Sequence, residues 1–172
     1  MRKVVFGGAI SLDNYLARTD GAVDWLLWDK EVGAIIAESW NRFDTFLLGR
    51  KTYEISAKSG MGSGGGAKTY VFSRTLKKSP KGVKIIAADA AGFVRNLKQQ
   101  DGKDICLIGG GDFAKTLFEA GLIDEIGFNI HPVLLGAGVP AFLPLERQID
   151  MELLECKVFK TGCVLVTYRV KH

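Results

Sequence analysis

Short apolar segments without polar alternation recur along the chain, and they constrain its fold more than any other feature. The first covers residues 3–10, and residues 43–48 and 105–108 have the same character. Strands with one solvent-exposed face alternate apolar and polar residues, whereas strands that are buried on both faces do not. The three segments therefore predict the central strands of a sheet that is covered on both sides.

Segments with helical spacing of apolar residues lie between the predicted strands. Asp29 is placed to cap one helix at its N-terminus, a second helix starts at Asp89, and a third follows the glycines at 109–111. Gly121 is placed to end the third helix in a left-handed conformation, with Leu122 packing back on Leu117. The three apolar stripes are Val32, Ile35, Ile36 and Trp40; Ala90, Phe93, Val94 and Leu97; and Phe113, Ala114, Leu117 and Phe118.

Further strands are predicted at residues 69–72, 83–87 and 126–130, and a hairpin at 151–159 and 164–170 turns at 160–162. Residues 49–53 read as a loop that leaves the second strand, and the glycine-rich stretch 59–66 predicts a mobile loop. Helices alternate with strands early and two strands pair late. The pattern indicates an α/β fold with a largely parallel sheet, helices on both faces and an antiparallel C-terminal edge.

Composition narrows the class of protein. With 172 residues and 47% apolar positions, the chain can build one sizeable core, and we expect one domain over 1–172. The charge of +4 is scattered, without the basic stripe of a nucleic-acid binder. Cys106, Cys156 and Cys163 lie in apolar runs, so we expect no metal site. No apolar run approaches the ~20 residues of a membrane span, and no signal-peptide pattern precedes the first strand, which predicts a cytoplasmic protein.

Glycines 109–111 follow a buried strand and open a helix, where backbone N–H groups and the helix dipole favour an anion. A tight strand-to-helix turn requires glycine for steric reasons alone, so this motif has two interpretations. Asp112, just inside the helix, suits the helix dipole and would repel a phosphate on the same side.

Two other strand ends carry anion-binding side chains. Arg50, Lys51 and Thr52 follow Gly49 after the second strand, and Ser73-Arg74 follows the strand at 69–72. Arg offers a planar fork of donors and Lys a point charge. Ligands of open α/β sheets bind at strand ends, and three such ends favour a phosphate-binding function over a solvated loop.

The order and spacing of these motifs resemble the dihydrofolate reductase-like superfamily over almost the whole chain. The segment 131–140 is similar in particular to the branch that contains the reductase domain of bacterial riboflavin biosynthesis. The matching motifs are Ser11-Leu12-Asp13-Asn14-Tyr15-Leu16-Ala17, Asp20-Gly21 with Asp24-Trp25, Leu48-Gly49-Arg50-Lys51-Thr52-Tyr53, Val71-Phe72-Ser73-Arg74, Ile108-Gly109-Gly110-Gly111 and Gly121-Leu122-Ile123-Asp124-Glu125.

The resemblance implies a three-layer fold and an NADPH site. It places the pyrophosphate and the 2′-phosphate end on Gly49, Arg50, Lys51 and Thr52, and the 2′-phosphate also on Ser73 and Arg74. It places the second pyrophosphate contact on Gly110, Gly111, Asp112 and Phe113, and the nicotinamide near Ala9, Leu16 and Ile108. It also implies a homodimer, because relatives in this branch are often dimers and an apolar strand at 163–170 would be an exposed edge.

The substrate side is less defined. Dihydrofolate reductases carry a carboxylate on their first helix, and here Asp29 has an alternative role as a helix cap. The candidate substrate residues are Asp13, Trp25, Asp29 and Tyr53, with Trp25 equally suited to packing, while His131 is expected to make a structural hydrogen bond. The hypotheses are an NADPH-dependent reductase of a small heterocyclic, pterin- or pyrimidine-like, or carbonyl substrate; a non-catalytic or regulatory dinucleotide-binding protein; and a basic interaction module.

Overall fold

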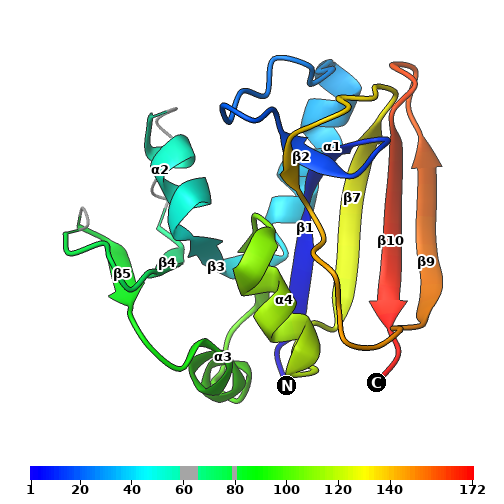
Figure 1. The fold of residues 1–172 in the computed structure, drawn as a ribbon. Coiled ribbons are helices and arrows are strands. Elements are labelled where there is room, and N and C mark those ends of the chain that lie inside the picture. The colour runs from blue at the N-terminus through cyan, green and yellow to red at the C-terminus, as the bar shows by residue number, and fades with distance from the viewer. Residues whose placement is uncertain (59–65, 79–80) are drawn as a thin grey trace.

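In the part of the chain that the structure describes, eight strands form one mixed sheet in the order β5-β4-β3-β6-β1-β7-β10-β9 (Figure 1). The computed structural model describes residues 1–58, 66–78 and 81–172, so the expected mobile loop at 59–66 lies outside the described residues except for Gly66. The strands are β1 Val4–Ser11, β3 Phe43–Gly49, β4 Lys68–Phe72, β5 Val83–Ile86, β6 Asp104–Ile108, β7 Glu125–His131, β9 Met151–Val158 and β10 Val164–Val170. β2 (Tyr15–Ala17) and β8 (Val139–Pro140) pair separately.

The pairings from β5 to β7 are parallel, and β10 is antiparallel to both β7 and β9. Four helices of the described residues cover the sheet: α1 Lys30–Trp40, α2 Arg50–Lys58, α3 Ala90–Lys98 and α4 Gly111–Glu119. α3 and α4 pack on the face that holds the main core around Phe6, Leu107 and Phe128. α1 and α2 cover the other face through Val32 and Tyr53. Helices on both faces and an antiparallel edge confirm the predicted fold class.

The predicted helix ends are also confirmed. Asp29 Oδ1 accepts a hydrogen bond of 2.8 Å from the Val32 N–H, and Asp89 Oδ1 accepts one of 2.9 Å from the Gly92 N–H. Gly121 ends α4 with φ of 63°. The Leu122 N–H donates to the Leu117 carbonyl at 2.9 Å, which is the closing bond of a Schellman motif.

The loop predicted at 49–53 is wrong, because Arg50 already begins helix α2. This helix has no apolar stripe that a sequence pattern can reveal, since Tyr53 is its only fully buried side chain among the residues described. It is held by the packing of Tyr53 against Phe46, Leu48 and Val71 of the sheet. A tertiary contact therefore overrides a weak local signal.

The predicted edge strand is a second correction. β10 lies between β7 and β9, so the edge is β9, Met151–Val158. An apolar pattern shows that a strand is buried but not which strands are its neighbours. No helix in the described part of the chain is long and apolar enough to span a membrane.

Candidate functional site

The carboxyl ends of the parallel strands lie side by side, as the sequence predicted. In the register of the sheet, Gly49 at the end of β3 is opposite Phe72 at the end of β4. Leu48 is opposite Ile108, where β6 ends. The turns that begin with Gly49, Ser73 and Gly109 therefore meet at one edge of the sheet, where α2 and α4 also begin (Figure 1). This is the edge at which ligands of open α/β sheets bind.

A cleft of about 380 Å³ lies at the ends of β4 and β5, beside the first turns of α3 and α4. Four residues that the resemblance assigns to the cofactor line it: Ser73, Arg74, Asp112 and Phe113. Phe113 stacks on Phe72 with a centroid distance of 4.2 Å, which gives the cleft a flat aromatic wall. The other lining residues are Ile86, Ala87, Ala88, Asp89, Ala90 and Thr116.

The charges in the cleft are of both signs. Arg74 is exposed, and its guanidinium makes no ion pair with any residue described. The Ser73 hydroxyl accepts hydrogen bonds from the N–H groups of Thr75 and Leu76, at 3.2 and 2.9 Å. Its oxygen also lies 3.4 Å from Thr75 Oγ1, and either hydroxyl can be the donor of that bond. Asp112 contributes a carboxylate to the same cleft, so an anion there has both an attractive and a repulsive neighbour.

The three glycines of the β6–α4 turn have different surroundings. A Cβ at Gly109 would lie 2.0 Å from Thr52 Oγ1, and one at Gly110 would lie 2.5 Å from the Ala141 carbonyl oxygen. These two positions require glycine because the protein itself fills the space, which is the steric interpretation. Gly111 has φ of +70°, and a Cβ added there would meet no described atom within 4 Å, so a ligand can approach its backbone.

The N-terminus of α4 is open to an anion. Its N-cap is Gly110, which has no side chain to accept a hydrogen bond from the first turn. The first N–H groups of a helix have no partner within the helix, and they carry the positive end of its dipole. Together with the open space at Gly111, this turn can hold a phosphate group.

The predicted pyrophosphate residues of β3 and α2 lie next to this turn. Gly49 is close to Phe113, since a Cβ added there would lie 4.0 Å from the Phe113 Cβ, and Thr52 packs on Gly109. Arg50 Nη1 donates to both carboxylate oxygens of Glu54, at 2.9 and 3.0 Å, so its charge is already paired. Lys51 is exposed on the first turn of α2.

The predicted nicotinamide residues lie around the end of β1. Gly7 of β1 is opposite Ile108, the last residue of β6, whereas β1 continues to Ser11. The carbonyl of Lys3 points to β6 and that of Val4 points toward β7, so by alternation the backbone groups of Ala9 point to the side of β6. No strand of the described sheet pairs with Ala9 on that side, so these groups are available to a ligand. Leu16, in β2, is half-buried and packs against the main core.

The candidate substrate residues all have structural contacts. Asp13 accepts hydrogen bonds from Ser11 Oγ at 2.6 Å and from the N–H groups of Leu135 and Gly136 at 3.1 and 2.8 Å. The hydrogen bond from Ser11 is the largest influence on the pKa of Asp13 and lowers it below 3.8. The two backbone hydrogen bonds lower this pKa further, whereas burial raises it. The carboxylate of Asp13 therefore links its own loop to the loop that contains Leu135 and Gly136.

Asp29 caps α1, and Tyr53 is buried beneath α2. Trp25 is 8% exposed and meets the His131 ring edge-on at a centroid distance of 5.3 Å. Its Nε1 is buried without a hydrogen-bond partner among the described residues. His131 makes the expected structural hydrogen bond, accepting at Nδ1 from the Leu27 N–H at 3.1 Å.

Sequence reasoning missed the β5 side of the cleft and the segment around Ala141 that covers Gly110. Asp89, predicted as the start of a helix, follows the end of a fourth parallel strand and was the available signal. Within the described ranges, no group of three or more His, Cys, Asp or Glu side chains is arranged to hold a metal ion.

The family model of the RibD C-terminal domain matches residues 2–165. The uncharacterized protein YyaP of Bacillus subtilis is 31% identical over 97% of this chain and 94% of its own length. A putative riboflavin biosynthesis protein of Shewanella has 26% identity and a TM-score of 0.85, with all of both chains covered.

A deaminase/5-amino-6-(5-phosphoribosylamino)uracil reductase of Thermotoga maritima shares the fold, with a TM-score of 0.72 and 17% identity over 99% of this chain and 57% of that one. The family match and the Shewanella structure confirm the dihydrofolate reductase-like fold. The chain belongs to the RibD C-terminal domain family.

Proposed function

We propose that this protein is an NADPH-dependent reductase that transfers a hydride to a small heterocyclic, pterin- or pyrimidine-like, or carbonyl substrate. Its family contains reductases, which supports the reaction class. The observation that carries the proposal is the cleft at the strand ends, where Arg74 is free of ion pairs with the described residues beside the aromatic wall of Phe72 and Phe113. The open N-terminus of α4 lies at its side.

Each part of this edge would bind a different part of the dinucleotide. Phe72 and Phe113 would form the wall for the adenine, and Arg74 and the Ser73 hydroxyl would donate to the 2′-phosphate. The first turn of α4 would hold the pyrophosphate at Gly111. The free backbone groups near Ala9 would orient the carboxamide of the nicotinamide.

NADPH, when bound, supplies the hydride, and the protein supplies orientation and exclusion of water. The end of β1 would fix the nicotinamide face that meets the substrate. We assign no general acid to this chain, because the carboxylates of Asp13 and Asp29 hold a loop and a helix end.

Titration of tryptophan fluorescence with NADPH and NADH tests the cofactor site. Arg74→Ala removes the free guanidinium, so the Kd for NADPH should rise roughly tenfold or more while the Kd for NADH changes by less than about twofold. Lys77→Ala, an exposed cation outside the lining of the cleft, is the matched control and should leave both values unchanged. Equal affinities of the Arg74 variant and the natural protein for NADPH would exclude this 2′-phosphate site.

A second candidate is a non-catalytic or regulatory dinucleotide-binding protein, favoured by the structural roles of Asp13 and Asp29. The decrease of NADPH absorbance with a panel of pterins, pyrimidines and carbonyl compounds separates the two. The panel includes 5-amino-6-(5-phosphoribosylamino)uracil, the compound in the name of the Thermotoga protein. Tight NADPH binding without turnover of any panel member would favour the binding protein.

We propose that residues 1–172 act as one domain, in the cytoplasm, and that the working unit is a homodimer. Sedimentation velocity measures the last of these directly.

A further inference from the structure

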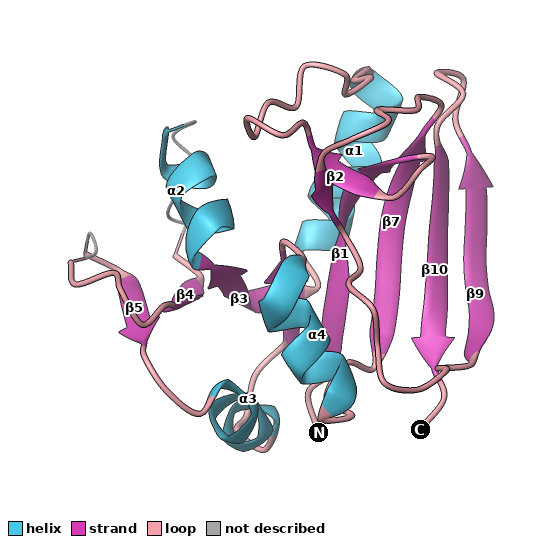
Figure 2. Cartoon of the chain, in the orientation of Figure 1, coloured by secondary structure: helices cyan, strands magenta, loops and turns pink. Residues whose placement is uncertain are grey.

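Loop segments lie at the carboxyl ends of β1 and β7, next to the end of β1 that would hold the nicotinamide. They are residues 12–14 and 18–28, on either side of β2, and residues 132–138, between β7 and β8. Figure 2 shows them as loops at the end of the sheet where β1 and β7 finish. The Leu12 N–H donates to the Val133 carbonyl at 2.9 Å, which holds the first and last segments together. We call these three segments the substrate loops.

The substrate loops are joined to both helices that begin at the cofactor edge. A Cβ added at Gly21 would lie 3.0 Å from Ile55 Cδ1 of α2. The Ala141 N–H donates to the Asn14 carbonyl at 2.9 Å, and Ala141 also covers Gly110 in front of α4. A substrate placed against a nicotinamide at the end of β1 would therefore contact these loops.

The charged side chains of the substrate loops already have partners. Arg18 is the only Lys or Arg in the three segments, and its Nε donates to Asp24 at 2.7 Å. Asp20 accepts a hydrogen bond of 2.9 Å from the Ala22 N–H, and Asp13 links two of the segments. Within these described loops, no unpaired cation is left to bind a phosphate or carboxylate group of a substrate.

The side chains that the substrate loops expose are apolar. Leu12 is 60%, Trp28 63% and Leu134 70% exposed, and Val23 and Leu27 are exposed as well. Aliphatic and aromatic side chains of this kind form the walls of sites for small molecules, and aromatic rings stack on flat heterocycles. The loops therefore suit the uncharged body of a substrate.

Anion-binding groups are instead concentrated on the cofactor side of the same edge. There Arg74 lines the cleft, and the first turn of α4 has no side-chain cap. An anionic group that enters a site without a partner loses its hydration and gains nothing in return. The two sides of the edge therefore differ in the charge that they accept.

We propose that the substrate of this chain is an uncharged, unphosphorylated compound with a flat or apolar body. It accepts a hydride from NADPH and a proton from water, and NADP⁺ and the reduced compound remain. The substrate class rests on the proposed reductase function and narrows it. A phosphorylated compound should be a poor substrate even when the ring that accepts the hydride is the same.

Matched pairs of compounds that differ in one anionic group test the substrate class. One pair is 5-amino-6-(5-phosphoribosylamino)uracil, named for the Thermotoga protein, and its dephosphorylated form. The other is 4-carboxybenzaldehyde and benzaldehyde. The loss of NADPH absorbance gives kcat/KM, which should be at least about 100-fold higher for the neutral member of a pair that is turned over. Tryptophan fluorescence of the protein saturated with NADP⁺ gives the Kd of each compound, and the neutral member should bind more tightly.

A cation added to the substrate loops should reverse the preference. Leu12→Lys and Leu134→Lys each supply a partner for the anionic group, so the ratio of kcat/KM for the charged member to that for the neutral member should rise at least about tenfold. Both positions are exposed, and the fold should tolerate either change. Leu153→Lys, at an exposed leucine of β9 outside these loops, is the matched control and should leave the ratio unchanged.

Salt gives a readout that needs no variant. With NADPH saturating, the KM of a neutral substrate should change less than about twofold between about 0.05 and about 0.5 M NaCl, because screening acts on charged pairs. A KM that rises steeply with salt would show recognition of a charge and would overturn the substrate class.

The two proposals fail in different ways. Equal or higher kcat/KM for the charged members overturns the substrate class and leaves the reductase in place. A neutral member that binds no more tightly than its charged partner to the protein with NADP⁺ has the same meaning. Failure to bind NADPH overturns the reductase and the substrate class together. Binding of NADPH without turnover counts against the reductase, and the fluorescence titrations then still decide which compounds the loops accept.

Discussion

His131 is a buried base at the end of β7, and its surroundings keep it neutral. It is 1% exposed, and burial lowers its pKa below the ordinary 6.5 because a charged ring loses its hydration there. Its Nδ1 accepts from the Leu27 N–H, a bond that a protonated nitrogen cannot accept. The residue therefore joins β7 to the segment before α1 only in its neutral form.

The free energy of unfolding should fall as the pH drops from about 7 to about 5.5, because the unfolded chain binds a proton at His131 that the folded chain does not. Urea denaturation at the two pH values measures this difference. His131→Gln should reduce the difference, even though the variant is less stable at both values. The only other histidine is His172, and His172→Gln should retain the natural pH dependence. An unchanged pH dependence in His131→Gln would contradict the role of this ring.

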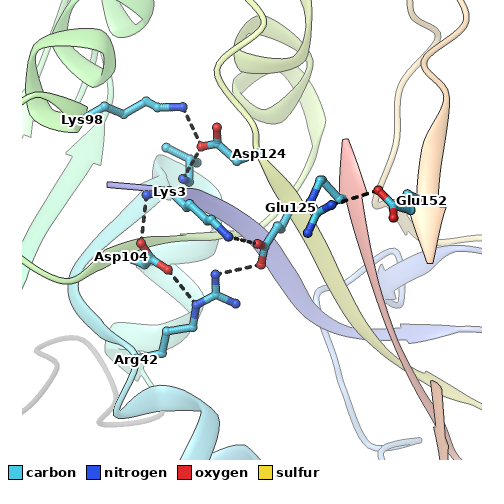
Figure 3. Close-up of polar contacts among 9 residues, drawn as sticks. Lys3, Arg42, Lys98, Asp104, Asp124, Glu125 and Glu152 are labelled. Atoms are coloured by element: carbon cyan, nitrogen blue, oxygen red, sulfur yellow. Dashed lines mark hydrogen bonds and ion pairs between the residues drawn. The ribbon is translucent and has the colours of Figure 1, made fainter. Parts of the chain in front are cut away.

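At the scale of elements, an ion network ties several strands together at the end of the sheet opposite the cleft (Figure 3). Glu125, at the start of β7, is 3% exposed and accepts from Lys3 Nζ at 2.6 Å and from Arg42 at 2.7 Å. Arg42 also donates to Asp104, at the start of β6, at 2.7 Å. Burial raises the pKa of Glu125, but the bonds from Lys3 and Arg42 outweigh it and bring the pKa below 4.5.

Two cations share the buried Glu125 carboxylate, so their removal should not be additive. Lys3→Met and Arg42→Met should each destabilise the protein by about 1–2 kcal/mol, since the other cation still compensates the charge. The double variant should lose at least ~1 kcal/mol more than the sum, because the carboxylate is then buried without a partner. Urea denaturation of the four proteins measures this. Arg18→Met removes an exposed ion pair with Asp24 and should cost less stability than either Lys3→Met or Arg42→Met, because solvent screens that pair. Additive losses in the double variant would refute the coupling.

For the whole molecule, the sequence predicted the features that depend on local chemistry. The central strands follow from runs such as residues 43–48, and the starts of α1 and α3 from Asp29 and Asp89. The pairing of β2 with β8 and the helix α2 depend on contacts between distant segments, which no local pattern contains. The site shows the same division: the strand ends that carry Ser73 and Gly111 were predicted, whereas the covering of Gly110 by Ala141 required the fold.

The cofactor cleft and the ion network lie at opposite ends of the sheet, and this separation makes their effects on stability independent. NADPH at about 100 times its Kd should stabilise the folded chain by about 2.7 kcal/mol, which thermal unfolding shows as a higher Tm. Arg42→Met should lower the Tm without NADPH and keep the increase that NADPH produces, because distant sites contribute additively. Arg74→Ala should do the reverse, with a natural Tm alone and a reduced increase at the same NADPH concentration. If Arg42→Met removed the increase, the two ends of the sheet would be coupled through the strands, and the cleft could not be treated as a preformed site.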